Sequence, residues 1–205
     1  MVIPNPLSLV GSKPHDAELP ITSIIAAAQV HQTFLRAGQD TPFFSLLDTH
    51  GKAHALAKLL ENGPVVISFQ RGDWCSYSVE SVKALKAIQE GISMLSALLI
   101  IVVPASANSS DSKQFAGVLT LIDPRLKVSA SFGLTYDVPQ ELRQEYLRLG
   151  FSPQRPGLKE WRIPAPATYV IDRFGKIALA FLNLDYRHPM KVDALLSVVR
   201  GLSKE

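Results

Sequence analysis

The chain has 205 residues and a net charge of +3, with 47% hydrophobic and 19% charged residues. This length and composition fit a folded domain with a substantial core and exclude a disordered chain. Lysine and arginine form no block, so we expect neither nucleic acid nor a membrane as a partner. The single cysteine, Cys75, excludes an intrachain disulfide and is typical of a reducing compartment, so we expect a cytoplasmic protein.

Residues 1–37 predict an appendage to the main domain. The proline-rich residues 1–20 favour a loosely ordered arm. An accessory helix is expected to follow and to end at Gly38. The apolar residues 21–30 are too few to cross a bilayer. We therefore expect an N-terminal arm and helix over residues 1–37 and one domain over residues 38–205.

Residues 38–56 predict a β-hairpin, because two short apolar segments flank the turn sequence Asp48-Thr49-His50-Gly51. Gly51 can take the positive φ that a tight turn requires. A short connecting helix is expected over residues 57–62, where Gly63-Pro64 then ends it.

Residues 65–78, VVISFQRGDWCSYS, place the only cysteine between a strand and a helix. Residues 65–69 form an apolar run of strand length, and a polar turn follows. From Val79 to Ile92, apolar residues recur at three- and four-residue steps, which predicts a helix packed on a sheet. Cys75 is therefore expected in, or just before, the first turn of this helix. A helix N-terminus stabilises an anion and so favours a reactive thiolate.

Further apolar segments alternate with helical patterns along the rest of the chain. The expected strands are residues 97–103, 118–122, 167–172 and 177–182, the last two as an antiparallel hairpin. The expected helices are residues 123–133, 139–149 and 191–202. Residues 151–164, with three prolines, are expected to be irregular. This alternation predicts an α/β fold, a central mixed β-sheet flanked by helices.

Two motifs carry a family resemblance, RGDWC at residues 71–75 and PATYVID at residues 166–172. Residues 38–202 resemble the peroxiredoxin-like branch of the thioredoxin fold, both in these two motifs and in the order of the other expected strands. This branch is the alkyl hydroperoxide reductase and thiol-specific antioxidant (AhpC/TSA) family. The resemblance implies a thioredoxin-like fold, here with an N-terminal helical extension and a β-hairpin.

The resemblance also implies that a proline on the sheet packs beside Cys75. In thioredoxin-like proteins the proline that opens the later strand is cis and packs beside the reactive cysteine, and Pro166 matches it. The alternative is a trans proline at the start of a strand.

Relatives with this turn usually carry a second cysteine where this chain has Ser78. Ser68 and Gly72 replace the proline and the hydroxyl residue of the peroxidase motif, and the usual arginine before the later strand is absent.

By this resemblance, the expected activity is that of a one-cysteine thiol peroxidase and antioxidant, in which Cys75 reduces a peroxide and becomes a sulfenic acid. An external thiol, such as glutathione or a thioredoxin-like partner, would then reduce it. Arg71 would stabilise the thiolate or orient the peroxide, unless it forms an ion pair with Asp73. Trp74 would wall one side of the sulfur or serve only packing, and Ser78 would donate a hydrogen bond to the sulfur.

Two alternatives stay open. The first is a monothiol oxidoreductase that forms mixed disulfides with a disulfide substrate. The second is a redox-inactive binding protein in which Cys75 is an inert buried residue. No metal and no cofactor are expected, because the histidines follow no ligand spacing and no phosphate-binding loop is visible. The fold is compatible with a homodimer.

Overall fold

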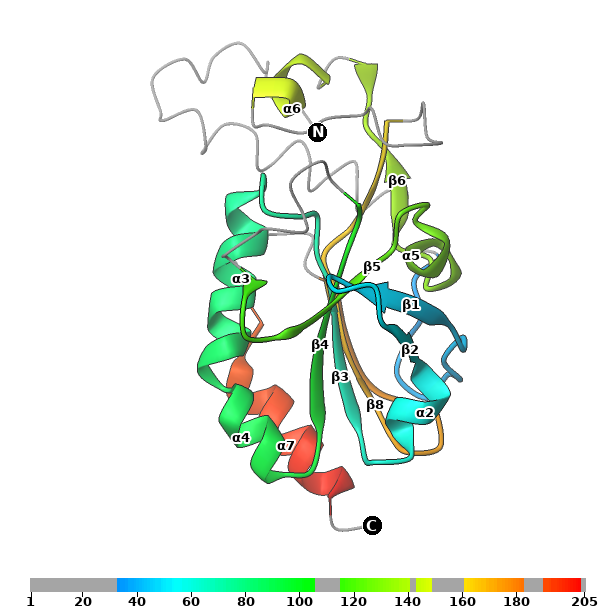
Figure 1. The fold of residues 1–205 in the computed structure, drawn as a ribbon, viewed down its shortest axis with the longest axis vertical. Helices are drawn as coiled ribbons and strands as arrows, with labels where there is room; N and C mark the ends of the chain where they lie inside the picture. The colour runs from blue at the N-terminus through cyan, green and yellow to red at the C-terminus, as the bar shows by residue number, and fades with distance from the viewer. Residues whose placement is uncertain (1–32, 106–114, 141–142, 149–160, 183–189, 204–205) are drawn as a thin grey trace, which may run out of the picture.

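A central mixed sheet organises the protein. The computed structural model describes residues 33–105, 115–140, 143–148, 161–182 and 190–203. Within these residues, seven strands form one sheet in the order β2-β1-β5-β4-β3-β8-β9 (Figure 1). The strands are β1 (Ser45–Asp48), β2 (Ala53–Ala55), β3 (Val65–Phe69), β4 (Leu98–Val103), β5 (Leu119–Ile122), β8 (Ala167–Ile171) and β9 (Ile177–Leu182). The α/β fold with a central mixed sheet is therefore confirmed.

Helices cover both faces of this sheet (Figure 1). The described helices are α2 (Leu56–Leu60), α3 (Ser76–Ala87), α4 (Gln89–Met94), α5 (Lys127–Ser131), α6 (Arg143–Arg148) and α7 (Val192–Leu202), of which α6 lies apart from the sheet. α3, α4 and α7 pack on one face, while α2 and α5 pack on the other. None of the helices in the described part of the chain is both long and apolar enough to cross a bilayer.

The two faces bury separate cores, and β3 contributes to both. Its five residues are all buried, and it pairs in parallel with β4 and antiparallel with β8. Successive side chains of a strand point to opposite faces, so Phe69 enters the core with α2 and α5 while Val66 enters the other. The Phe69 ring lies 4.8 Å from that of Phe132, which lies 5.1 Å from that of Tyr169. Burying each such ring contributes about 2–3 kcal/mol.

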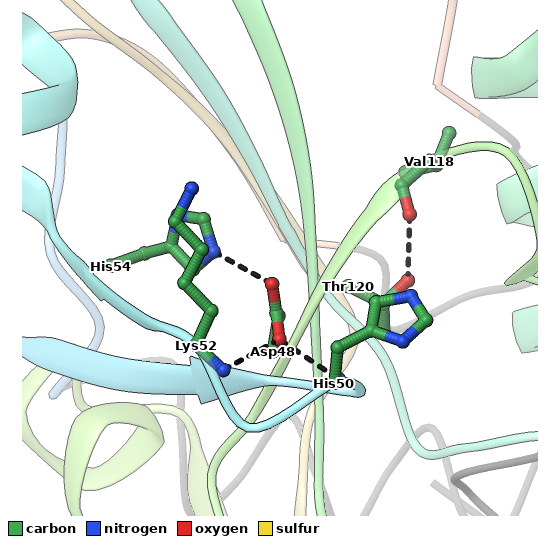
Figure 2. A network of polar contacts seen from close by, with 6 residues as sticks. All are labelled: Asp48, His50, Lys52, His54, Val118 and Thr120. Carbon is green, nitrogen blue, oxygen red and sulfur yellow. Dashed lines mark hydrogen bonds and ion pairs between the residues drawn. The ribbon is translucent and has the colours of Figure 1, made fainter.

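The first hairpin is closed by one carboxylate (Figure 2). The Oδ1 atom of Asp48 accepts hydrogen bonds from the backbone N–H groups of His50, at 2.8 Å, and Lys52, at 3.0 Å. Its Oδ2 atom lies 2.8 Å from Nε2 of His54, which donates across the hairpin. These bonds, above all that from His54, lower the pKa of Asp48 from 3.8 to about 2. The hairpin predicted around this turn is therefore confirmed, and ionised Asp48 stabilises it.

Replacing Asp48 by Asn should weaken the hairpin in a pH-dependent way. The pKa of Asp48 is lower in the folded chain, so its carboxylate stabilises the fold above about pH 4 and loses this effect as pH falls through about 2. Urea unfolding at several pH values should show Asp48→Asn less stable than wild type at pH 7, with the gap narrowing towards pH 2. A gap independent of pH would contradict this role.

Several expected boundaries were wrong. The helix expected at residues 123–133 begins only at Lys127, because Leu126 before it has a left-handed backbone with φ 54. The Asp123 carboxylate then accepts the N–H of Ser129 in the first turn of the helix. The long helix after Cys75 is interrupted at Ile88 and continues as α4. The accessory N-terminal helix falls mainly on residues 1–32, outside the described residues, and residues 33–37 are not helical.

A second, two-stranded sheet lies where irregular chain was expected. β6 (Thr135–Asp137) pairs antiparallel with β7 (Arg162–Pro164), and β7 leads directly towards β8. The Ala165 N–H donates to the Leu134 carbonyl at 2.6 Å and continues this pairing. We call residues 134–138 with 161–165 the two-stranded unit. Its position beside the end of β3 matters for the site described below.

Gly133 allows the N-terminal segment to pack on the domain. It has φ +71, and a Cβ atom at this position would overlap the backbone carbonyl of Thr33. The same contact is fixed by a hydrogen bond from Thr33 Oγ1 to the Gly133 carbonyl at 2.9 Å. Residue 133 therefore has to be glycine for both conformational and steric reasons.

Gly133→Ala should lower the free energy of unfolding by roughly 2–4 kcal/mol, from the left-handed backbone and the clash together. Gly201→Ala is the matched control, because Gly201 lies in α7 with open space around it. That change should leave stability equal or raise it by about 0.5–1 kcal/mol. Chemical denaturation of both variants measures the difference, and equal effects would refute the account of Gly133.

Candidate functional site

Cys75 lies at the N-terminus of α3, directly beyond the end of β3. It is the residue that caps the helix, with extended backbone angles, and its carbonyl accepts the N–H of Val79 at 3.1 Å. The residue is 6% exposed. Its sulfur makes no hydrogen bond within the described part of the chain. The predicted strand, turn, thiol and helix are thus present in this order, and the thiol is close to the positive end of a 12-residue helix.

The turn before Cys75 is fixed through the backbone of Arg71. The Arg71 N–H donates to Oγ of Ser78 at 3.0 Å, across seven residues. The Arg71 carbonyl accepts a hydrogen bond from the indole Nε1 of Trp74 at 2.8 Å. Ser78 is 1% exposed, so this bond joins the turn to the first turn of α3 in the interior. Ser78 therefore anchors the turn, and the expected bond from Ser78 to the sulfur is not present between these two described residues.

The backbone angle at residue 72 accounts for glycine in this turn. Its φ is +115, and a Cβ atom at this position would lie 3.3 Å from Cδ1 of Trp74. The backbone angle favours glycine, and a side chain at this position would press on the indole ring. Trp74 is half-buried and packs against the core that contains Phe69. Trp74 therefore packs over the turn at Gly72.

The guanidinium group of Arg71 is buried beside an aromatic ring. Arg71 is 5% exposed, and its Cζ lies 5.8 Å from the centroid of the Tyr136 ring on β6. No ion pair links Arg71 with Asp73, both of which are described residues, so the ion pair considered from the sequence is not formed. The site thus holds a buried cation in the same turn as the thiol.

Pro166 lies at the same end of the sheet, but its peptide bond is trans. Ala167 is the register partner of Phe69, which places the buried Pro166 at the level of Gln70, just beyond the paired residues. None of the peptide bonds in the described residues is cis, so the expected cis Pro166 was wrong. The chain enters β8 from the two-stranded unit, and the hydrogen bond from Ala165 to Leu134 already fixes its direction there.

A polar seam next to the turn is formed by the buried residues Thr168, Ser68 and Gln70 and the half-buried Ser81. Oγ of Ser68 lies 2.8 Å from Oγ1 of Thr168 on the neighbouring strand. Nε2 of Gln70 donates to Oγ of Ser68 at 2.8 Å and to Oγ of Ser81 on α3 at 3.2 Å. Ser68, which stands where the family motif has proline, therefore ties β3 to β8 and, through Gln70, to α3.

Four predicted site residues, Arg71, Trp74, Cys75 and Ser78, share one turn, and Pro166 lies at the adjacent strand end. Sequence reasoning missed Tyr136 and Gln70. Gln70 follows the apolar run of β3 directly, so its burial could have been suspected from its position. Tyr136 lies 65 residues from Arg71 in a three-residue strand, and no sequence pattern joins the two.

No group of three or more His, Cys, Asp or Glu side chains able to hold a metal occurs among the described residues.

Ser78→Ala should lower the free energy of unfolding by about 1–3 kcal/mol, because the buried N–H of Arg71 would lose its acceptor. Ser76, on the same helical turn, is exposed, so Ser76→Ala should stay within about 0.5 kcal/mol of wild type. Chemical denaturation gives both values. If Ser78→Ala and Ser76→Ala were equally stable, Ser78 would not anchor the turn.

Three solved structures show similar folds. Peroxidoxin BcpB from Mycobacterium tuberculosis has 18% sequence identity and a TM-score of 0.62, over 82% of this chain and 98% of that one. Peroxiredoxin Q from Xanthomonas campestris has 15% identity and a TM-score of 0.60, over 82% and 99%. A Chlorobium tepidum protein, provisionally assigned as the thiol:disulfide interchange protein DsbE, has 18% identity and a TM-score of 0.52, over 82% and 99%.

These identities are low, so the structural likeness establishes the thioredoxin-like fold alone. No curated protein matches the sequence. The family itself is shown by the sequence, because residues 37–180, well over half of the chain, match the AhpC/TSA family. The chain therefore belongs to the AhpC/TSA family.

Proposed function

We propose that this protein is a one-cysteine thiol peroxidase in which Cys75 reduces a hydroperoxide and an external thiol restores it. The observation that carries this proposal is the setting of Cys75. The only thiol of the chain lies at the N-terminus of α3, in the same turn as the buried cation of Arg71. Both features stabilise negative charge on sulfur, and the thiolate is the nucleophilic form.

The first step oxidises Cys75. The thiolate attacks one peroxide oxygen, a sulfur–oxygen bond forms, and the oxygen–oxygen bond breaks. The leaving oxygen takes a proton and departs as an alcohol, or as water if the substrate is hydrogen peroxide. The sulfur becomes a sulfenic acid, and the peroxide is reduced by two electrons.

An external thiol completes the cycle. It attacks the sulfenic sulfur, a mixed disulfide forms, and water leaves. A second thiol then attacks the mixed disulfide, releases Cys75 as a thiolate and departs as a disulfide. The chain has no second cysteine that could attack the sulfenic acid or the mixed disulfide. Both attacking thiols therefore come from outside, from a small thiol such as glutathione or from a thioredoxin-like protein.

The other predicted site residues support Cys75 in this proposal. Arg71 stabilises the thiolate and the charge that develops on the leaving oxygen. Trp74 forms the wall over Gly72, and Ser78 anchors the turn through the Arg71 N–H. Pro166 lies at the end of the neighbouring strand, level with Gln70.

Burial of the thiol favours a peroxide over a disulfide as the oxidant. Cys75 is 6% exposed, and a disulfide must bring two sulfur atoms and their substituents into line with the attacking sulfur. A hydroperoxide presents only a small oxygen group. A disulfide oxidoreductase is the second candidate, favoured by the similarity to the DsbE-assigned protein. Either activity needs a reduced thiol, which suits the cytoplasm, and either is compatible with a homodimer.

Reaction with limiting hydrogen peroxide tests the proposal. Wild-type protein treated with one equivalent of peroxide and a sulfenic-acid trap should gain the adduct at Cys75, and peroxide should be consumed catalytically when excess thiol is supplied. Cys75→Ser should do neither, because it lacks the nucleophile. Absence of both adduct and turnover in folded wild-type protein would rule the peroxidase out.

Oxidised glutathione separates the two candidates. A disulfide oxidoreductase should rapidly gain the mass of one glutathione at Cys75, while the peroxidase should react with peroxide much faster than with this disulfide. A protein that gains neither glutathione nor a sulfenic adduct would be a redox-inactive member of the family. Intact mass spectrometry of the same samples reads all three results.

A further inference from the structure

Arg71 is held at its backbone, and its guanidinium lies beside Tyr136. Its backbone N–H and carbonyl are bound by Ser78 and Trp74. Its guanidinium, carried into the interior, lies 5.8 Å from the ring centroid of Tyr136, within the range of a cation–π interaction. Moving a cation out of water costs free energy. A ring that faces the buried guanidinium from another strand therefore helps to determine the position that the guanidinium takes.

Tyr136 is placed there by the two-stranded unit. It is 2% exposed and pairs with Ile163 across β6 and β7. The backbone bonds on either side, from Ala165 to the Leu134 carbonyl and from Val138 to the Trp161 carbonyl, are both 2.6 Å long. The ring therefore has little freedom to follow the guanidinium if it moves, and it acts as a fixed surface against which Arg71 rests.

The arginine of this site comes from a different segment of the chain than in the relatives. The arginine that relatives carry before the later strand is absent, and Pro166 occupies its place. The cation instead comes from the turn after β3. It faces the ring of Tyr136 on β6, and β6 pairs with β7, the strand that precedes β8.

We infer that Tyr136 is a positioning residue for Arg71, and that through Arg71 it sets the reactivity of the Cys75 thiol. The inference rests on the proposed role of Arg71 beside Cys75. It does not require that peroxide be the substrate. The ring face, rather than the phenolic hydroxyl, carries the effect, so phenylalanine at this position should serve as well as tyrosine.

Alkylation of Cys75 by iodoacetamide tests this without relying on peroxidase activity. The reagent is neutral, so Arg71 does not attract it and affects the rate only through the thiol. Tyr136→Leu should lower the second-order rate constant by about 3- to 10-fold, as expected for loss of a partly desolvated cation–π contact. Tyr136→Phe should keep the rate of wild type.

A double-mutant cycle identifies the route of the effect. In an Arg71→Met background, where the cation is gone, Tyr136→Leu should cause no further loss. If the two losses multiply instead, Tyr136 does not act through Arg71 and the inference is overturned. A peroxidase assay on the same proteins separates the two proposals, because failure of peroxide turnover would leave this coupling measurable.

Trp161→Leu is the matched control. Trp161 belongs to the same two-stranded unit, and its ring lies 5.1 Å from Cζ of Arg143, so the change removes the same kind of contact outside the turn of Cys75. Its alkylation rate should match that of wild type. An equal loss in Trp161→Leu and Tyr136→Leu would show that only the stability of the unit matters, and would overturn the inference.

Fluorinated phenylalanines at position 136 keep the test valid if Tyr136→Leu does not fold. Successive ring fluorines preserve the shape and weaken the negative face of the ring. The alkylation rate should therefore fall stepwise with fluorination when Arg71 is present and stay constant in Arg71→Met. A rate independent of fluorination with Arg71 present would contradict the role assigned to the ring.

Discussion

The two hydrogen bonds to the backbone of Arg71 are the constraint on which the site depends. They join the turn after β3 to Trp74 and to the first turn of α3, so the end of the central strand and the start of the helix cannot move independently. Gly72 adopts its left-handed conformation inside this closed turn. The result is a thiol at a helix N-terminus whose position is fixed by side chains on both sides.

The turn lies where the two cores of the molecule meet. Next to it, the polar seam reaches from Thr168 through Gln70 to α3, on the face that carries α3, α4 and α7. On the other face, the Arg71 side chain meets Tyr136, which belongs to the core of Phe69 and Tyr169. The turn that carries Cys75 is therefore contacted from both faces of the sheet.

The sequence predicted best the strands that are fully buried and formed by one continuous run of residues. The run that became β4 is wholly apolar, and those of β3 and β8 are apolar except for Ser68 and Thr168. The thiol follows β3 after a short turn, so the central sheet and the place of Cys75 could be predicted. The two-stranded unit could not, because β6 and β7 have three residues each and are paired only through tertiary contact. The same limit hid Tyr136. The cis form of Pro166 was inferred from family resemblance alone, and the structure has the trans form.

The central claim is that the fold activates Cys75 although it buries it. Burial alone slows the reaction of a thiol, whereas a helix N-terminus and a nearby cation accelerate it. The most direct measurement is the rate constant of Cys75 with hydrogen peroxide in the folded protein, compared with the urea-unfolded protein at the same pH. The account predicts a folded rate at least about tenfold higher, as a gain of roughly 1.4 kcal/mol in transition-state stabilisation would give. A folded rate equal to or below the unfolded rate would contradict it.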